Sequence, residues 1–220
     1  MLSKEGLTTM ASSSMLFLAS FTVFGIPFLP KGLHPPFYVY SFIAIFLAAV
    51  FSSERHRRPI FGFAVVLIIL EIVTDRIDNG WLNHICSVMI LGFFFLAIYF
   101  LLNQIVRQHR VTPRVILEAI NGYLLLGICF SVLVAIAMRD DANAFSLPAE
   151  EVGMVSYNSV YYAFVTMSTL GYGEIVPLTP GTKALAMLIC VTGQLYLTVV
   201  IALLVGKYIG YWSAREMRKQ

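Results

Sequence analysis

One short segment of this sequence combines residue types that could hold a bare cation. Residues 166–174 read T-M-S-T-L-G-Y-G-E, with Gly171 and Gly173 on either side of Tyr172. Glycine adopts positive φ without a steric penalty. A backbone that alternates between right- and left-handed conformations can turn its carbonyls to one side. A ring of such carbonyls from several chains can replace the water around a dehydrated cation.

The composition places this segment in a membrane protein. Of the 220 residues, 59% are hydrophobic and 12% are charged, which is about half the charged fraction usual in soluble domains. Cys86, Cys129 and Cys190 each lie in an apolar run, so neither a disulfide framework nor a cysteine metal site is expected. The first apolar run ends without a cleavage site, and we expect it to be retained as a membrane helix.

Charge-free runs predict six membrane-spanning helices, because about 20 apolar residues cross the hydrocarbon core. We expect an all-α membrane protein with helices at roughly residues 14–30, 37–53, 59–74, 84–104, 115–138 and 182–207. With the N-terminus inside, 11 of the 15 Lys and Arg residues fall on the inner side. This asymmetry predicts a multi-pass protein of the plasma (cell inner) membrane with both termini in the cytoplasm.

The segment between the last two helices contains an apolar stretch too short to span the membrane. Residues 154–168 are moderately apolar, and glycines and prolines follow them. We expect a re-entrant element, with a helix at 155–168 that enters the membrane and returns as extended chain. Such chain is tolerated at membrane depth only where protein or a water-filled path surrounds it. The acidic loop at 140–151 is either a plain solvated loop or a region that concentrates cations.

The hexamer from Thr169 to Glu174, T-L-G-Y-G-E, resembles the selectivity-filter signature of the tetrameric potassium-channel superfamily. The resemblance implies K⁺ bound by backbone carbonyls, with the Thr169 hydroxyl as the innermost ring and Gly173 completing the filter. The carbonyls that would bind K⁺ belong to Thr169, Leu170, Gly171 and Tyr172. Because each chain carries one copy of the motif, the resemblance implies a homotetramer.

The resemblance also divides the chain. It covers about residues 115–210, which would form the pore domain of outer helix, pore helix, filter and inner helix. Residues 1–114 match only as a generic four-helix transmembrane domain, and 211–220 would form a short cytoplasmic tail. The predicted fourth helix carries no Arg or Lys from His84 to Val106, so this sensor-like arrangement lacks sensor charges. We expect little intrinsic voltage dependence.

Four residues are expected to support the filter. Thr166 precedes it, and Tyr161 and Tyr162 stand where relatives commonly carry tryptophans. Ordinary packing of a short helix is the alternative explanation for the two tyrosines. Glu174 replaces the more usual Asp, and Val165 stands where some relatives carry a buried acid, so a paired carboxyl clamp is not expected.

The stretch from Ala184 to Tyr208, which makes up most of the last predicted helix, supplies the candidate cavity and gate. Gly193 is a candidate hinge, and close packing is the equal alternative for this glycine. Helical spacing places five further residues on or near one face that we expect to line the cavity: Gln194, Leu197, Thr198, Ile201 and Val205. Ile201 and Val205 could form a constriction that closes by dewetting.

These features predict a potassium-selective channel that conducts K⁺ passively through a pore in membrane lipid, and not an enzyme. A weakly selective cation channel on the same architecture is one alternative, although an intact T-L-G-Y-G disfavours it. A membrane carrier is the other, and the sequence shows no internal repeat that would favour it. We expect no cofactor apart from the permeant K⁺, no nucleic-acid partner and no soluble ligand-binding domain in this chain.

Overall fold

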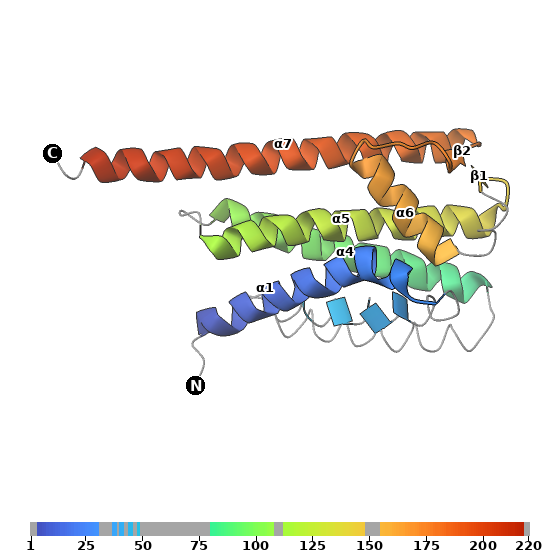
Figure 1. Ribbon diagram of the computed structural model, residues 1–220, viewed down its shortest axis with the longest axis horizontal. Helices are drawn as coiled ribbons and strands as arrows, with labels where there is room; N and C mark the ends of the chain where they lie inside the picture. The colour runs from blue at the N-terminus through green and yellow to red at the C-terminus, as the bar shows by residue number, and fades with distance from the viewer. Residues whose placement is uncertain are drawn as a thin grey trace.

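The protein is a layered bundle of long helices crossed by one short helix. The computed structural model describes residues 4–30, 37, 38, 40, 41, 44, 45, 48, 80–107, 112–147 and 155–217. Five α-helices have defined bounds in these residues: α1 Lys4–Ser20, α4 Gly80–Arg107, α5 Pro113–Asp140, α6 Val155–Met167 and α7 Pro180–Met217. In Figure 1, α7 lies along one side, α5 and α4 form the middle, and α1 lies on the other side.

Helix α1 is followed by two turns with a different winding. The chain passes into a π-helical turn at Phe21–Gly25 and then a 3₁₀ turn at Ile26–Phe28. Pro27 lies inside the second turn, and proline cannot donate a backbone hydrogen bond and crowds the preceding carbonyls. The altered winding next to this proline is the local response to that loss.

Helix α5 is the central helix of the described residues. It contacts α1, α4, α6 and α7, and 67% of its apolar span is buried in the single chain. Two buried polar contacts fix neighbours on it: the Asn121 side-chain amide donates to the Ser12 carbonyl at 2.8 Å, and the Tyr196 hydroxyl donates to the Ala119 carbonyl at 2.7 Å. Helix α5 therefore supports both α1 and α7.

A small antiparallel strand pair closes the end of the bundle beyond α5. Strand β1, Phe145–Ser146, pairs with β2, Val176–Pro177. The Ala144 carbonyl also accepts hydrogen bonds from the Leu178 N–H at 2.9 Å and from the Thr182 hydroxyl at 3.0 Å. The sequence did not predict this pair, which ties the chain after α5 to the chain before α7.

The start of α7 is capped by two threonines. Thr179 and Thr182 exchange reciprocal bonds of 3.2 Å between each backbone N–H and the other hydroxyl oxygen. Pro180 occupies the first helical position. An N–H at this position would have no partner within the helix, so the proline costs no hydrogen bond there. These residues fix where the loop ends and the long helix begins.

Four of the six predicted membrane-spanning helices are confirmed by the described residues. Four segments within the described residues are long and apolar enough to cross a membrane: Met10–Phe28, Val88–Arg107, Pro113–Asp140 and Pro180–Ile209. They correspond to the first, fourth, fifth and sixth predicted spans. Of the second span, 37–53, only scattered helical residues are described. The third span, 59–74, lies outside the described residues, so the total of six stays a prediction.

Two bounds differ from the prediction by about ten residues. Helix α1 begins at Lys4, ahead of the predicted residue 14, and α7 continues to Met217, beyond the predicted residue 207. Charged and polar side chains do not stop an α-helix that has left the hydrocarbon core, and an estimate based on apolar runs misses such extensions. The beginning of α1 and the end of α7 lie at the same end of the bundle (Figure 1).

Candidate ion-conduction site

Helix α6 carries the glycine-containing segment to the middle of the bundle. It has 13 residues, which corresponds to about 20 Å at 1.5 Å per residue, well short of the hydrocarbon thickness. It contacts α5 on one side and α7 on the other, and crosses obliquely between them (Figure 1). The chain then turns back toward β2 and α7. The helix begins at Val155 as predicted and ends at Met167.

The backbone of Thr169–Gly173, the loop segment, alternates in handedness. Positive φ angles occur at Thr169 (63°), Gly171 (55°) and Gly173 (87°), and at no residue between them. This alternation is the one expected from the spacing of the glycines. Thr169 adopts the left-handed region without being a glycine, which costs about 1–2 kcal/mol. The surrounding contacts must therefore hold it there.

Hydrogen bonds anchor the N–H groups at the start of the loop segment. The Thr169 N–H donates to the Thr166 carbonyl at 3.0 Å, and the N–H groups of Leu170 and Gly171 donate to the Val165 carbonyl at 3.0 and 3.3 Å. Among the described residues, no hydrogen bond reaches the carbonyls of the loop segment. The N–H groups thus face back toward α6, while the carbonyls remain available to a ligand.

The predicted supporting tyrosines have different surroundings. The Tyr161 hydroxyl donates to Glu174 Oε1, directly after the loop segment. The Tyr161 ring also stacks on Tyr157, with centroids 6.2 Å apart. Tyr162 is buried and meets Phe145 of β1 edge-on, with centroids 5.0 Å apart. Tyr161 therefore reaches the end of the loop segment by a side-chain hydrogen bond, whereas Tyr162 packs against the strand pair.

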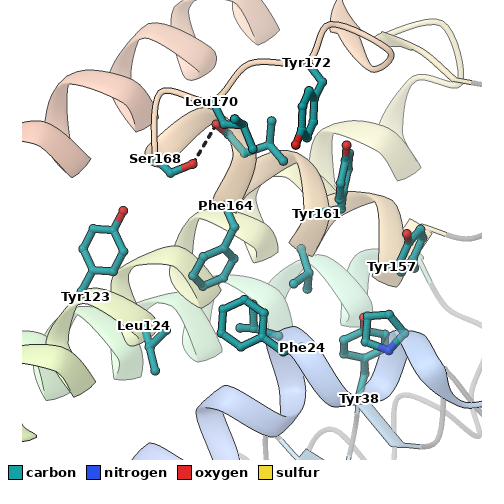
Figure 2. A pocket seen from close by; sticks show the side chains of 14 residues that line it. Phe24, Tyr38, Tyr123, Leu124, Tyr157, Tyr161, Phe164, Ser168, Leu170 and Tyr172 are labelled. Atoms are coloured by element: carbon teal, nitrogen blue, oxygen red, sulfur yellow. Dashed lines mark hydrogen bonds between the residues drawn. The ribbon is translucent and has the colours of Figure 1, made fainter.

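A cavity lies behind the loop segment. Its volume is about 470 Å³, and its walls come from the turns after α1, Tyr38, α5 and α6. Leu170 and Tyr172 border it, and in Figure 2 the hydroxyls of Tyr161 and Tyr172 point toward each other across one edge. The lining is almost entirely apolar apart from tyrosine hydroxyls and Ser168. No local sequence signal marks this cavity, because its walls come from helices far apart in the chain.

The predicted cavity residues of α7 fall into two groups. Gln194, Thr198, Ile201 and Val205 are exposed in the single chain. Leu197 is instead half-buried, in a groove of about 220 Å³ between α5 and α7 that Ile201 also borders. The structure therefore separates Leu197 from the polar Gln194 and Thr198.

Gly193 lies where α6 meets α7. It is buried, and a Cβ atom at this position would lie 2.6 Å from the carbonyl oxygen of Met167 and 2.4 Å from its Cγ. Met167, the last residue of α6, is itself fully buried. Nothing in the sequence singles out Met167, because an apolar residue at a helix end has no distinctive pattern.

Comparison with known proteins agrees with this geometry. Residues 124–209 match a family model described as an ion channel. The potassium voltage-gated channel subfamily A member 6 proteins of mouse, rat and human are each 30% identical to this chain over 101 residues. These matches cover 44% of this chain and 17% of each relative. No solved structure matched the chain.

The residues matched by the family model include most of α5, all of α6, the loop segment and most of α7. They thus include both glycines of T-L-G-Y-G and the apolar helices that frame them. The match of residues 124–209 to an ion channel family and the similarity to potassium channels support the potassium channel superfamily for this part of the chain, and the described apolar helices indicate a membrane protein.

Proposed function

We propose that this chain forms a homotetrameric, potassium-selective channel that conducts K⁺ passively across the membrane. The observation that carries the proposal is the alternation of backbone handedness at Thr169, Gly171 and Gly173, combined with loop carbonyls that accept no hydrogen bond from the described residues. In this proposal the carbonyls of Thr169, Leu170, Gly171 and Tyr172 replace the hydration shell of K⁺.

The proposed assembly of several chains follows from the number of carbonyls that a closed ring needs, and the resemblance of the motif sets that number at four. One loop segment offers one carbonyl at each level, so a closed ring requires several chains around one axis. The surface of α7 supports this assembly, since only 22% of its apolar span is buried in the single chain. Large apolar side chains such as Met187, Val191 and Leu195 are more than half exposed. We propose that neighbouring copies cover part of this surface and membrane lipid covers the rest.

In the assembled channel, α6 would direct its C-terminal end toward the axis, where the partial negative charge of that end favours a cation. The exposed Gln194 and Thr198 of α7 would line the cavity below, with Ile201 and Val205 as the narrowing. The proposed orientation places both termini in the cytoplasm of the plasma (cell inner) membrane, as the Lys and Arg distribution favours.

Selectivity is tested by ion flux through the purified full chain in liposomes with opposing K⁺ and Na⁺ gradients. We expect the reversal potential to follow the K⁺ gradient and to be nearly independent of Na⁺, because the carbonyl ring compensates K⁺ dehydration. A reversal potential that follows Na⁺ as readily would instead indicate the weakly selective cation channel.

A second prediction isolates the role of positive φ in the loop segment. Gly171→Ala should reduce K⁺ over Na⁺ permeability at least tenfold, because alanine at φ 55° costs about 1–2 kcal/mol. The measurement is the permeability ratio from reversal potentials, with assembly checked by chemical cross-linking. Gly181→Ala is the matched control, since neither glycine has an atom within 4 Å of an added Cβ and only Gly171 has positive φ. Equal permeability ratios in the two variants would show that this segment is not the selectivity filter.

A third prediction concerns the bond from Tyr161 to Glu174. Tyr161→Phe and Glu174→Met should each shorten the time for which K⁺ current persists at constant voltage, because the loop loses a hydrogen bond to a charged group worth about 1.5–3 kcal/mol. The double variant should add little to either single change, since both remove the same bond. Tyr99→Phe, on the exposed surface of α4, should have no effect. Fully additive single effects would show that the two residues act separately.

The fourth prediction concerns voltage. Within α4 the first cation is Arg107 in the last turn, where its Nε donates to Asn103 Oδ1 at 3.0 Å. One charge at a helix end crosses little of the membrane field, whereas steep sensors move about 3–4 charges per subunit. We therefore expect a shallow conductance–voltage relation. Several elementary charges of gating charge per channel would contradict this expectation.

A further inference from the structure

The contact between α6 and α7 at Gly193 is unusually close. An added Cβ would approach the Met167 carbonyl oxygen to 2.6 Å and its carbonyl carbon to 3.3 Å. A side chain can rotate away from such a contact, but a backbone carbonyl moves only with its helix. For an ordinary contact of 3.4 Å or more, the end of α6 would have to shift relative to α7.

A shift at Met167 would be transmitted directly to the loop segment. Met167 stands two residues before Thr169, and the Thr169 N–H donates to the Thr166 carbonyl in the same last turn. The N–H groups of Leu170 and Gly171 also depend on this turn through the Val165 carbonyl. The positions of the first loop carbonyls are therefore set by where the end of α6 rests.

The backbone of α7 shows no break at Gly193 that would indicate another role for this glycine. The helix runs as a continuous α-helix from Pro180 to Met217, through Gly193 and Gly206. Each glycine lowers helix stability by about 1 kcal/mol relative to alanine, so both offer the same backbone freedom. They differ in their surroundings, because an added Cβ at Gly206 has no atom within 4 Å.

We propose that Gly193 is a positioning residue for the filter. In this proposal the absence of a Cβ at Gly193 allows the C-terminal end of α6 to pack directly against α7. This packing places the Thr169 carbonyl at the position along the pore axis, and at the distance from it, that K⁺ binding requires. The inference rests on the proposed potassium-selective function and deepens it. It assigns to ion selection a glycine for which the sequence left a hinge for opening and close packing as equal alternatives.

The experiment compares Gly193→Ala with Gly206→Ala in the full-length chain, reconstituted in liposomes under opposing K⁺ and Na⁺ gradients. Both changes stiffen α7 by the same amount, but only the first adds an atom against Met167. We expect Gly193→Ala to lower K⁺ over Na⁺ permeability at least fivefold and Gly206→Ala to leave it unchanged. A wild-type ratio maintained in Gly193→Ala, or an equal loss in both variants, would overturn the inference.

Wild-type protein in the same series keeps the two proposals apart. A wild-type channel that does not prefer K⁺ would contradict the proposed function. If the wild-type channel is selective and Gly193→Ala keeps the same selectivity, only the proposed role of Gly193 would be contradicted.

A companion variant covers the case in which Gly193→Ala does not assemble. Adding Met167→Ala removes the Cγ atom, which lies 2.4 Å from the Cβ that alanine would place at position 193, and gives the last turn of α6 room to shift. Recovery of cross-linked oligomers in the double variant, with Gly206→Ala assembling normally, would support the proposed packing of the end of α6 against Gly193. Loss of oligomers in Gly206→Ala as well would overturn it, because the stiffening of α7, and not the contact with Met167, would then be the cause.

Discussion

The structure depends on one constraint, which is that every backbone polar group at membrane depth needs a partner. Helices meet it internally, but the loop segment Thr169–Gly173 is not helical. Its first N–H groups are bonded to the last turn of α6, and among the described residues its carbonyls accept no hydrogen bond. A dehydrated cation is a partner that several such carbonyls can share. The short α6, the alternating φ angles and the exposed face of α7 all accord with that use.

The surrounding helices hold the loop segment through few but specific polar contacts. Tyr196 and Asn121 join α7 and α1 to the central α5. At the opposite end from the loop segment, the Lys207 ammonium donates to the carbonyls of Ile105 and Val106 in the last turn of α4. Such bonds between membrane helices are worth about 0.6 kcal/mol on average, so close packing must supply most of the stability. Gly193 against Met167 is the clearest case of such packing.

In the proposed channel, ion selection and opening would be separable tasks. The loop segment and the last turn of α6 form one unit, because Thr169, Leu170 and Gly171 are all bonded to that turn. The long α7 touches this unit near Gly193 and then continues for 24 residues to Met217. In the proposed channel, the far half of α7 would be free to move while its contact with α6 stays fixed, so that one helix would serve both the filter and a gate.

The apolar spans and the T-L-G-Y-G segment could be predicted from sequence because both depend on local chemistry. Charge-free runs located α5 to within about two residues at each end, since hydrophobic length is a property of consecutive residues. Glycine spacing likewise predicted the positive φ at Gly171 and Gly173, because glycine adopts it without a penalty, whereas Thr169 is held at positive φ by its surroundings. Other features became visible only in three dimensions: the pairing of β1 with β2, the separate surroundings of Tyr161 and Tyr162, the removal of Leu197 from the exposed face, and the contact of Gly193 with Met167. Each of these joins residues distant in the chain, and such contacts are fixed by how whole helices pack against one another.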